Sequence, residues 1–452
     1  MTLLNELSAE VCQRARMSRD PRFDGRFFVA VKTTGIFCRP ICPANLPKEE
    51  NVEYFSSQAL AVSAGYRPCL RCRPESAPHS WAWKGAETTF LRALTLIEQG
   101  ELDGSLETLA SRLGISDRYL RQLFQRHLGM PPKQYAQIQQ LMFAKQLLHT
   151  SQISITEVAY ASGFQSTRRF NDAFQKLFRL TPTQVRRERA ELPSRNHLSL
   201  AFRGPFDWSH MLDFYRLRAI EGMELVDEQS YQRHFVLGEG TGWFKASMAQ
   251  SHLDIEFEME RLSDLRHLVA RLRRMFDLDA DLISIEAHLE QVAPGLVRRT
   301  GIRIPGVWNA WEAGVRAVLG QQVSVKAAIG QLNLLVSTLA ASEGSTRYFP
   351  TPEQVQMSDL SFLRMPERRK ETLKRLADYV RLHPMDSPMA WLSLSGIGPW
   401  TVDYAQLRGE SRSHCFLTGD LIVKKALAKF PQLTAESVAP WGSYATFHCW
   451  SH

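Results

Sequence analysis

The segment LSGIGPW, residues 394–400, joins two predicted helices in the C-terminal half of this 452-residue chain. A charged amphipathic stretch containing ERRKETLKRLADYV precedes it, and a helix that starts with TVDYAQL follows it. Because Gly396 and Gly398 carry no side chains, the backbone of the turn can approach a phosphate and present amides at the start of the second helix. The segment therefore predicts a helical hairpin that contacts DNA, although short glycine turns between helices are common.

Asp420 lies in the segment HCFLTGDLIVKKAL, directly before another predicted helix and within reach of the hairpin. This pairing resembles the helix-hairpin-helix DNA glycosylases. The segments PFDWSHMLDFYRLRAIEGMELV, GVWNAWEAGVRAVLGQQVSV and YATFHCW extend the resemblance to AlkA-type 3-methyladenine glycosylases over residues 200–450. The resemblance implies a catalytic role for Asp420, since a carboxylate beneath the sugar stabilises an oxocarbenium-like state and orients or deprotonates water.

Four aromatic residues match the base pocket of that family: Phe214, Trp400, Tyr404 and Trp450. A purine alkylated at a ring nitrogen is cationic, and aromatic rings attract it through cation–π contact. A single aromatic residue is more often part of a core, so only the set indicates a pocket. Trp400 also stands where glycosylases with lyase activity carry a lysine. Because an indole cannot form a Schiff base, we expect a monofunctional glycosylase that leaves an abasic site.

Three positions depart from the family pattern, and one of them is Ser451, which replaces another aromatic residue. Gln322 stands in place of an intercalating leucine, and Leu421 follows the aspartate in place of a tyrosine. Glutamine can still fill the gap that a flipped base leaves and hydrogen-bond to the orphaned partner. We therefore expect these departures to affect base flipping and lesion range. The preceding residues, 198–287, contain strand-like stretches such as HLSLAFRG and HLDIEFEME and resemble the α+β N-terminal subdomain of AlkA.

Residues 105–187 contain an internal repeat, in which each copy predicts a helix, a glycine turn, a second helix and a proline stop. The repeated residues are Ala110, Gly114, Phe124, Gln125 and Pro132, which recur as Ala159, Gly163, Phe174, Gln175 and Pro182. This pattern is typical of a tandem helix-turn-helix module, and a helical linker domain is the alternative. GFQSTRRFNDAFQKLFRLTPTQVRR resembles the signature of AraC-type regulators. Outward polar residues of the second helices are candidate DNA contacts: Arg118, Arg121, Gln122, Arg168, Arg169 and Asn171.

Four of the seven cysteines lie close together in sequence: Cys38, Cys42, Cys69 and Cys72. Their spacing lets four thiolates converge on one zinc ion, and most such sites only stabilise a small fold. The flanking segments DGRFFVAVKTTGIFCRPICPA and GYRPCLRCRPE resemble the N-terminal domain of the Ada family over residues 24–75. That resemblance implies that Cys38 accepts methyl groups from DNA phosphotriesters. A zinc-bound sulfur stays deprotonated, and its methylation removes negative charge that repels DNA.

The net charge of +8 is divided unevenly, with basic N- and C-terminal parts around an acidic stretch at residues 191–290. Because phosphate neutralisation supplies much of DNA affinity, this distribution fits two DNA-contacting surfaces. No apolar run approaches the roughly 18 residues that a membrane span needs. We therefore expect a cytoplasmic protein without membrane contact.

Together these patterns predict a multidomain, mainly helical chain with α+β parts. The expected domains are an Ada-like zinc domain (1–80), an AraC-type tandem helix-turn-helix domain (84–190), an AlkA-like α+β subdomain (198–287) and a helix-hairpin-helix glycosylase domain (288–452). The predicted function is an alkylation-responsive transcriptional regulator fused to a glycosylase for purines such as 3-methyladenine, with zinc as cofactor and double-stranded DNA and RNA polymerase as partners.

Two alternatives stay open. In the first, the chain is only a regulator and the glycosylase fold serves as a DNA-binding module, as the departures at Gln322 and Leu421 suggest. In the second, the glycosylase is active and the N-terminal half targets DNA without methyl transfer.

Overall fold

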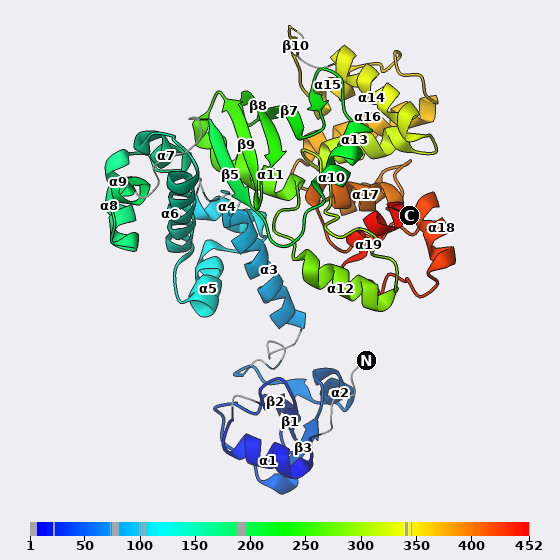
Figure 1. The fold of residues 1–452 in the computed structure, drawn as a ribbon. Helices are drawn as coiled ribbons and strands as arrows, with labels where there is room; N and C mark the ends of the chain where they lie inside the picture. The colour runs from blue at the N-terminus through cyan, green and yellow to red at the C-terminus, as the bar shows by residue number, and fades with distance from the viewer. Residues whose placement is uncertain are drawn as a thin grey trace. The chain divides into compact units, whose positions relative to one another are not determined.

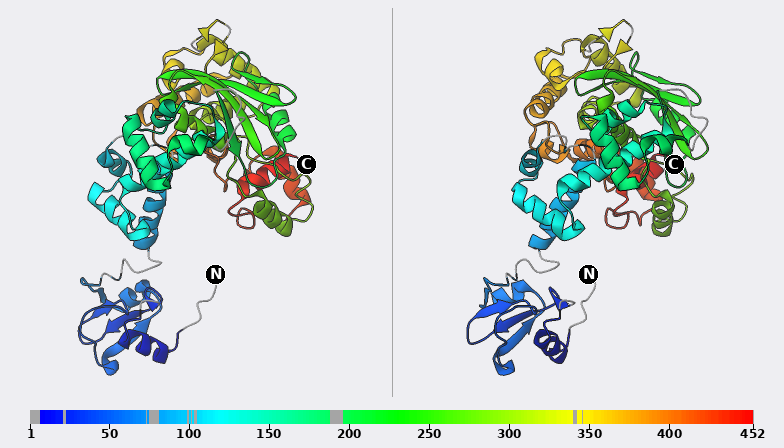
Figure 2. Two further views of the ribbon diagram at one scale, coloured as in Figure 1. Left: turned by 60° about the vertical axis from the view of Figure 1, so that its left-hand side comes forward. Right: turned by 90° about the vertical axis from the view of Figure 1, so that its left-hand side faces the viewer.

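The computed structural model describes residues 7–20, 23–72, 74, 81–98, 100, 102, 105–187, 196–339, 342–344 and 346–451. The chain forms two compact units, Met1–Gln139 and Gln140–His452. Their elements are labelled in Figure 1 and drawn from two further sides in Figure 2. The boundary between the units falls inside helix α6 (Pro132–Thr150), within the region predicted as the helix-turn-helix domain. The residue ranges of the four predicted domains stay predictions.

Before α6, the described part of the first unit contains one small sheet, five α-helices and the short 3-10 helix η2. Its elements are α1 (Ala9–Met17), β1 (Phe28–Val31), β2 (Ile36–Cys38), η2 (Glu49–Asn51), β3 (Val52–Phe55), α2 (Gln58–Ser63), β4 (Arg67–Pro68), α3 (Trp81–Glu98), α4 (Leu106–Arg112) and α5 (Asp117–Leu128). The segment NVEYFSSQALAVSAGY, between the two cysteine pairs, forms β3 and α2.

The small sheet has the strand order β3-β1-β2-β4. Successive side chains of a strand point to opposite faces, so both faces of β1 are used. Val29 packs with Cys12 and Ala15 of α1, whereas Phe28 and Ala30 pack with Ala61 of α2. The inner strand β2 and the edge strand β4 pair in parallel, with Phe37 opposite Pro68. This pairing brings the residues that follow both strands to the same edge of the sheet.

The repeat in the sequence forms two helix-turn-helix copies. The helices are α4 and α5 in the first copy, and α7 (Ile155–Ala161) and α8 (Thr167–Phe178) in the second. A serine caps the N-terminus of each helix by accepting a hydrogen bond from a backbone amide, which satisfies one of its free donors. The four caps are Ser105, Ser116, Ser154 and Ser166. Polar residues between buried positions are left on the outer face of α5 and α8.

The second unit combines a five-stranded antiparallel sheet with a helical part. Besides α7 and α8, its elements are α9 (Pro182–Arg187), β5 (His197–Ala201), α10 (Trp208–Arg216), β6 (Glu224–Val226), β7 (Ser230–Leu237), β8 (Gly240–Met248), β9 (His252–Met259), η4 (Leu262–Asp264), α11 (Leu265–Met275), α12 (Leu282–Val292), α13 (Ala310–Gly320), α14 (Val325–Leu339), β10 (Ser342–Glu343), β11 (Thr346–Arg347), α15 (Pro352–Met357), α16 (Glu367–Leu382), η5 (Pro388–Ser393), α17 (Pro399–Glu410), α18 (Leu421–Lys429) and α19 (Gly442–Trp450).

The five-stranded sheet, green in Figures 1 and 2, has the order β5-β9-β8-β7-β6. The stretches HLSLAFRG and HLDIEFEME form β5 and β9 as predicted, and Leu198 of β5 lies opposite Ile255 of β9. Alternate residues of the strands are buried against α11, whose Leu268 and Leu272 belong to the same core. A second core surrounds α13, which is buried along almost its whole length. The predicted mainly helical, multidomain fold with α+β parts is confirmed.

A network of four buried charged residues joins the sheet to α13. Arg233 of β7 donates to Glu312 of α13 and to Glu224 of β6, and Arg316 donates to both glutamates. Every side chain of the network is at most 6% exposed. Opposite charges thus compensate one another inside the unit.

The helical hairpin differs from the expectation in its first arm. ERRKETLKRLADYV forms α16, but Pro384 and Pro388 follow it, and proline cannot continue a helix. The short helix η5 therefore lies between α16 and the LSGIGPW turn, and it packs against α17 as the first arm. Within the described residues, no helix is both long and apolar enough to cross a membrane.

Candidate functional sites

A cavity of about 390 Å³ in the second unit is lined by all four predicted aromatic residues and by Asp420. The rings come from three helices, with Phe214 on α10, Trp400 and Tyr404 on α17, and Trp450 at the end of α19. The Phe214 and Trp450 rings are nearly parallel, 14° apart with centroids separated by 6.2 Å. Trp400 and Tyr404 are stacked with centroids 5.3 Å apart. The cavity thus offers several aromatic faces to a planar occupant.

Asp420 is the N-cap of α18, and its carboxylate is held in place by three hydrogen bonds. Oδ1 accepts from the amides of Ile422 (2.8 Å) and Val423 (3.2 Å) and from Trp450 Nε1 (3.1 Å). Donors at a helix N-terminus stabilise a negative charge there. Oδ2 makes no hydrogen bond among the described residues, so one oxygen is fixed while the other is available to an occupant of the cavity.

Gln322 lies outside the aromatic cavity, in the adjoining groove of about 1100 Å³. The groove also contains Gly396, Gly398, Trp400 and Asp420, so it connects the predicted hairpin to the cavity. Gln322 has a φ of 56°, a left-handed backbone that few residues other than glycine adopt. The neighbouring Gln321 donates from Nε2 to the Gly396 carbonyl and to Thr401 Oγ1, each at 3.2 Å. The turn that carries Gln322 is therefore tied directly to the hairpin.

The two hairpin glycines have different structural requirements. Gly396 has a φ of 93°, and a Cβ there would lie 2.1 Å from Thr372 Oγ1 of α16. A larger residue would therefore force the turn away from α16. A Cβ at Gly398 would meet no atom within 4 Å, so this position faces open space. The turn therefore requires glycine at position 396. At position 398, the missing side chain leaves the backbone of the turn exposed.

Sequence reasoning missed the arginines around the cavity. Arg218 lines it, and Arg408 donates from Nη1 to the Tyr404 hydroxyl at 2.9 Å. Arg368 and Arg369 of α16 line the groove beside the hairpin. The sequence offers one signal for Arg218. It follows Phe214 by four residues, so the two side chains are expected on the same face of a helix.

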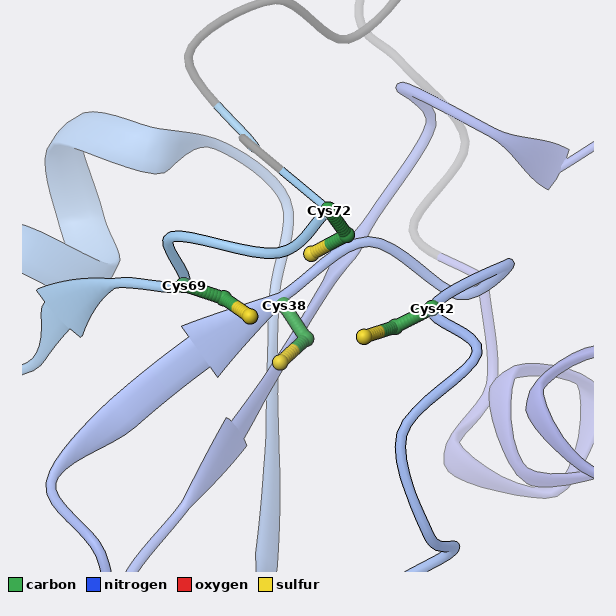
Figure 3. A group of neighbouring side chains, drawn as sticks. All are labelled: Cys38, Cys42, Cys69 and Cys72. Carbon is green, nitrogen blue, oxygen red and sulfur yellow. The ribbon is translucent and has the colours of Figure 1, made fainter.

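The four predicted cysteines come together at the edge of the small sheet, as Figure 3 shows. Cys38 ends β2 and Cys69 follows β4, so the parallel pairing of these strands places them side by side. Cys42 is reached through a turn in which its amide donates to the Arg39 carbonyl at 3.1 Å. All four Sγ atoms lie within 4.8 Å of one another.

This geometry fits a zinc ion. Four sulfurs at zinc–sulfur distances of about 2.3 Å would form a tetrahedron with edges of roughly 3.8 Å, close to the observed grouping. Without a cation the thiols cannot all ionise, because a hydrogen bond with Cys72, burial and the neighbouring thiolates raise the pKa of Cys38. A divalent cation removes this conflict. Cys38, Cys42, Cys69 and Cys72 form a zinc site, and zinc supplies the charge that keeps the sulfurs deprotonated.

The loop at the cysteine cluster is braced by an ion pair. Arg39 donates from Nε to Asp24 Oδ1 at 2.8 Å and pairs with the other carboxylate oxygen through Nη2. The Arg39 amide donates to Cys72 Sγ at 3.4 Å. A cavity of about 340 Å³ reaches Cys38 and is lined also by Arg16, Thr34 and Asn45. Cys38 is only partly buried and so lies within reach of a ligand.

The six predicted DNA contacts of the helix-turn-helix copies are all exposed. Arg118, Arg121 and Gln122 lie on α5, and Arg168, Arg169 and Asn171 lie on α8. Arg121 pairs with Asp117 at 2.9 Å one turn earlier on the same helix. Because their side chains take no part in either core, all six are accessible to a ligand surface.

Models of known families match three parts of the chain. The metal binding domain of Ada matches residues 11–75, a helix-turn-helix domain matches residues 109–188, and the AlkA N-terminal domain matches residues 197–309. Each match covers a region in which the sequence predicts that kind of domain.

Individual relatives cover both halves. The chain is 33% identical over 277 residues to DNA-3-methyladenine glycosylase 2 of Escherichia coli, which covers 56% of this chain and 96% of that protein. It is 35% identical over 170 residues to the bifunctional transcriptional activator/DNA repair enzyme Ada of the same organism, covering 38% and 47%. The probable bifunctional transcriptional activator/DNA repair enzyme AlkA of Mycobacterium tuberculosis is 34% identical over 475 residues, covering 98% of this chain and 96% of that protein. Because this last similarity spans nearly both proteins, the chain belongs to the family of bifunctional transcriptional activator/DNA repair enzymes of the AlkA type.

Proposed function

We propose that the second unit is a monofunctional DNA glycosylase that releases alkylated purines such as 3-methyladenine from double-stranded DNA. The observation that carries this proposal is the position of Asp420, which lines the same cavity as four aromatic residues and whose Oδ2 accepts no hydrogen bond from the described residues. The rings of Phe214, Trp400, Tyr404 and Trp450 would stack on a flipped base. Gln322 would fill the gap in the duplex, and Gly396 and Gly398 would let the backbone approach a phosphate.

In the proposed reaction the C1′–N bond breaks and the base leaves with the bonding electrons, which neutralises a cationic purine. The positive charge that develops on the sugar faces the carboxylate of Asp420, and this attraction lowers the barrier. A water molecule then attacks C1′ and transfers a proton to Oδ2, which releases it to solvent. The products are the free base and an abasic site. Trp400 leaves no amine for a Schiff base, so the DNA backbone stays intact.

For the first unit we propose that Cys38 accepts methyl groups from DNA phosphotriesters. Its sulfur attacks the methyl carbon, the carbon–oxygen bond breaks, and the phosphate diester leaves with the electron pair. The product thioether is stable, so each molecule reacts once. Loss of one negative charge at the cluster would strengthen binding to DNA.

The helix-turn-helix copies would place Arg118, Arg121, Gln122, Arg168, Arg169 and Asn171 on promoter DNA, where arginines more often contact phosphate than read bases. Activation would require contact with RNA polymerase. The alternative of a regulator without glycosylase activity rests on Gln322 and Leu421.

The decisive experiment measures base release from methylated duplex DNA by the full-length protein and by Asp420→Asn. Asparagine caps helices as well as aspartate does, so α18 should persist while the rate falls by about 10²–10³-fold. Asp281→Asn is the matched control, because Asp281 caps α12 in the same manner away from the cavity. Absence of released 3-methyladenine with the wild-type protein would refute the glycosylase proposal and favour the regulator alone.

A further inference from the structure

Four exposed apolar side chains gather where the groove beside the hairpin meets the aromatic cavity. Val323 precedes α14 and Val325 begins it, while Leu421 and Ile422 begin α18 directly after Asp420. Their exposed fractions are 41%, 45%, 68% and 48% in that order. Both valines and Ile422 line the cavity, and Val323 and Leu421 line the groove. The passage from the groove to the cavity is thus bordered by apolar side chains from two separate parts of the chain.

Leu421 differs from the other three because it lines the groove and not the cavity. Asp420 lines both, so its carboxylate lies where the two meet, and the next residue stands on the groove side. Asp420 Oδ1 accepts from the Ile422 amide at 2.8 Å and from the Val423 amide at 3.2 Å, which fixes the first turn of α18. Leu421 is therefore an exposed apolar side chain held at a fixed position beside Asp420.

The rest of the groove fits duplex DNA. Arg368 and Arg369 of α16 line it and carry positive charge, and the bare backbone at Gly398 leaves room for a phosphate. An exposed leucine gains free energy when an apolar surface covers it, and the faces of stacked bases are such a surface. Charge and apolar surface in one groove thus match the phosphates and the base stack of the same ligand.

Gln322, which lines the same groove, is less suited to separating stacked bases. Its amide would lose hydrogen bonds with water on entering a stack, whereas a leucine loses none and buries apolar surface. Proteins that unstack base steps frequently insert apolar side chains between them. The chemistry of the two residues therefore favours a division of tasks, in which Gln322 hydrogen-bonds to the orphaned base and Leu421 separates the stack.

We propose that Leu421 is a positioning residue for base release, an apolar wedge that enters the duplex beside the flipped nucleotide and keeps that nucleotide at the passage. It acts through the DNA, because it contacts the neighbouring bases and not the reacting atoms. This inference rests on the proposed glycosylase function, since a base must leave the stack before the wedge has a place to enter. It adds a second inserted side chain to Gln322, from a different part of the chain.

The first test measures unstacking without catalysis. Full-length Asp420→Asn is bound to a duplex in which 2-aminopurine, a base that fluoresces more strongly when it is unstacked, stands next to 7-methylguanine. Its fluorescence should rise on binding, and adding Leu421→Ala should make this rise smaller by about twofold or more. Leu421→Met keeps an apolar side chain of similar volume and should preserve the rise. Equal rises with and without Leu421→Ala would overturn the proposal.

The second test compares single-turnover release of 7-methylguanine from a paired site and from a bulge in which the lesion has no partner. Leu421→Ala in the otherwise wild-type protein should slow release from the paired site by about 10-fold. Release from the bulge should change by less than about twofold, because an unpaired base is easier to extrude. The matched control is Ile283→Ala, which alters a residue that is 66% exposed in the first turn of α12, outside the groove and the cavity, and should leave both rates unchanged.

The two substrates separate a wedge from a residue that only supports the fold. Equal slowing on both by Leu421→Ala would overturn the proposal, and so would an unchanged rate on the paired site. Release of no base by the wild-type protein from either DNA would overturn the glycosylase proposal. A 2-aminopurine signal that depends on Leu421 would in that case still support insertion of this residue into the duplex.

Discussion

Asp420 and Cys38 are anchored in different ways. Two backbone amides and an indole of the same unit hold the Asp420 carboxylate, beside cores that close around α13 and α19. Cys38 stands at the edge of a four-stranded sheet, where its sulfur lies close to those of the other three cysteines and a zinc ion would hold all four together. In the proposed functions, the site that would turn over repeatedly is held by the fold, and the site that would react once relies on an ion. The two regions should therefore fail independently.

The largest expected effect separates the two regions completely. Cys38→Ser should abolish methyl uptake from phosphotriester-containing DNA, because a hydroxyl is a much poorer nucleophile than a zinc-bound thiolate. Release of 3-methyladenine by the same variant should be unchanged. Labelled methyl transfer and base release, measured on one preparation, check this.

The control is Cys12→Ala, which alters the cysteine of that unit outside the cluster and should preserve uptake. Methyl uptake by Cys38→Ser at the wild-type level would exclude Cys38 as the acceptor and favour a first half that only targets DNA.

A second prediction concerns the scaffold of the cavity. Arg233 and Arg316 overcome the effect of burial and lower the pKa of Glu312 to about 2, so this side chain is ionised in the folded state. Glu312→Gln should reduce the free energy of unfolding by about 3–5 kcal/mol, because it leaves a buried guanidinium uncompensated. Denaturation followed by tryptophan fluorescence measures the loss.

Glu371→Gln is the comparison for that variant, since it breaks an exposed pair with Arg375 and should cost less than about 1 kcal/mol. A similar decrease in the free energy of unfolding in both variants would show that the buried network does not stabilise the fold around the cavity.

A third prediction tests how the carboxylate is held. Trp450→Phe keeps an aromatic ring but removes the Nε1 donor to Asp420. Losing a hydrogen bond to a charged group should slow base release by about 10-fold. Trp441→Phe, at the start of α19 and away from the cavity lining, should leave the rate unchanged. Equal rates in the Trp450 variant and the wild type would mean that the helix amides alone position the carboxylate.

The smallest expected effect depends on pH. Burial raises the pKa of Asp277 to about 7, although the Ile304 amide and the Tyr444 hydroxyl donate to it. Between the ordinary value near 4 and pH 7, the folded state keeps a proton that the unfolded chain has released. Stability contributed by this group is therefore lost as pH rises through that window.

Asp277→Asn removes this titration, and asparagine tolerates the φ of 53° at this position. From pH 6 to pH 8, the free energy of unfolding should fall by about 1 kcal/mol less in the variant than in the wild type. Parallel pH profiles of the two proteins would contradict the assignment.

Features that depend on local sequence were predictable. The glycine turn, the helix after Asp420, the serine-capped repeat and the cysteine spacing are each encoded within a few tens of residues, and the structure places them as expected. The four aromatic residues could be predicted only from the resemblance. They lie on α10, α17 and α19, and no local sequence pattern indicates that these helices come together.

Other features depend on tertiary packing and left no signal in the sequence. Arg218 and Arg408 look like ordinary surface arginines until α10 and α17 enclose them. The contact between Gln321 and Thr401 needs two turns that lie about 80 residues apart in the chain. The amphipathic pattern of α16 does not show where that helix ends, and the two prolines that follow it place η5 before the hairpin turn.

In the proposed mechanism, the bonding of Asp420 separates its role in stability from its role in catalysis. Oδ1 alone secures the start of α18, so an asparagine at this position would keep the helix and the duplex-facing surface while losing base release. A single nucleotide change in an aspartate codon would thus turn a repair enzyme into a protein that only occupies damaged DNA. A protein that only binds damaged DNA could therefore evolve from this architecture without a change of fold.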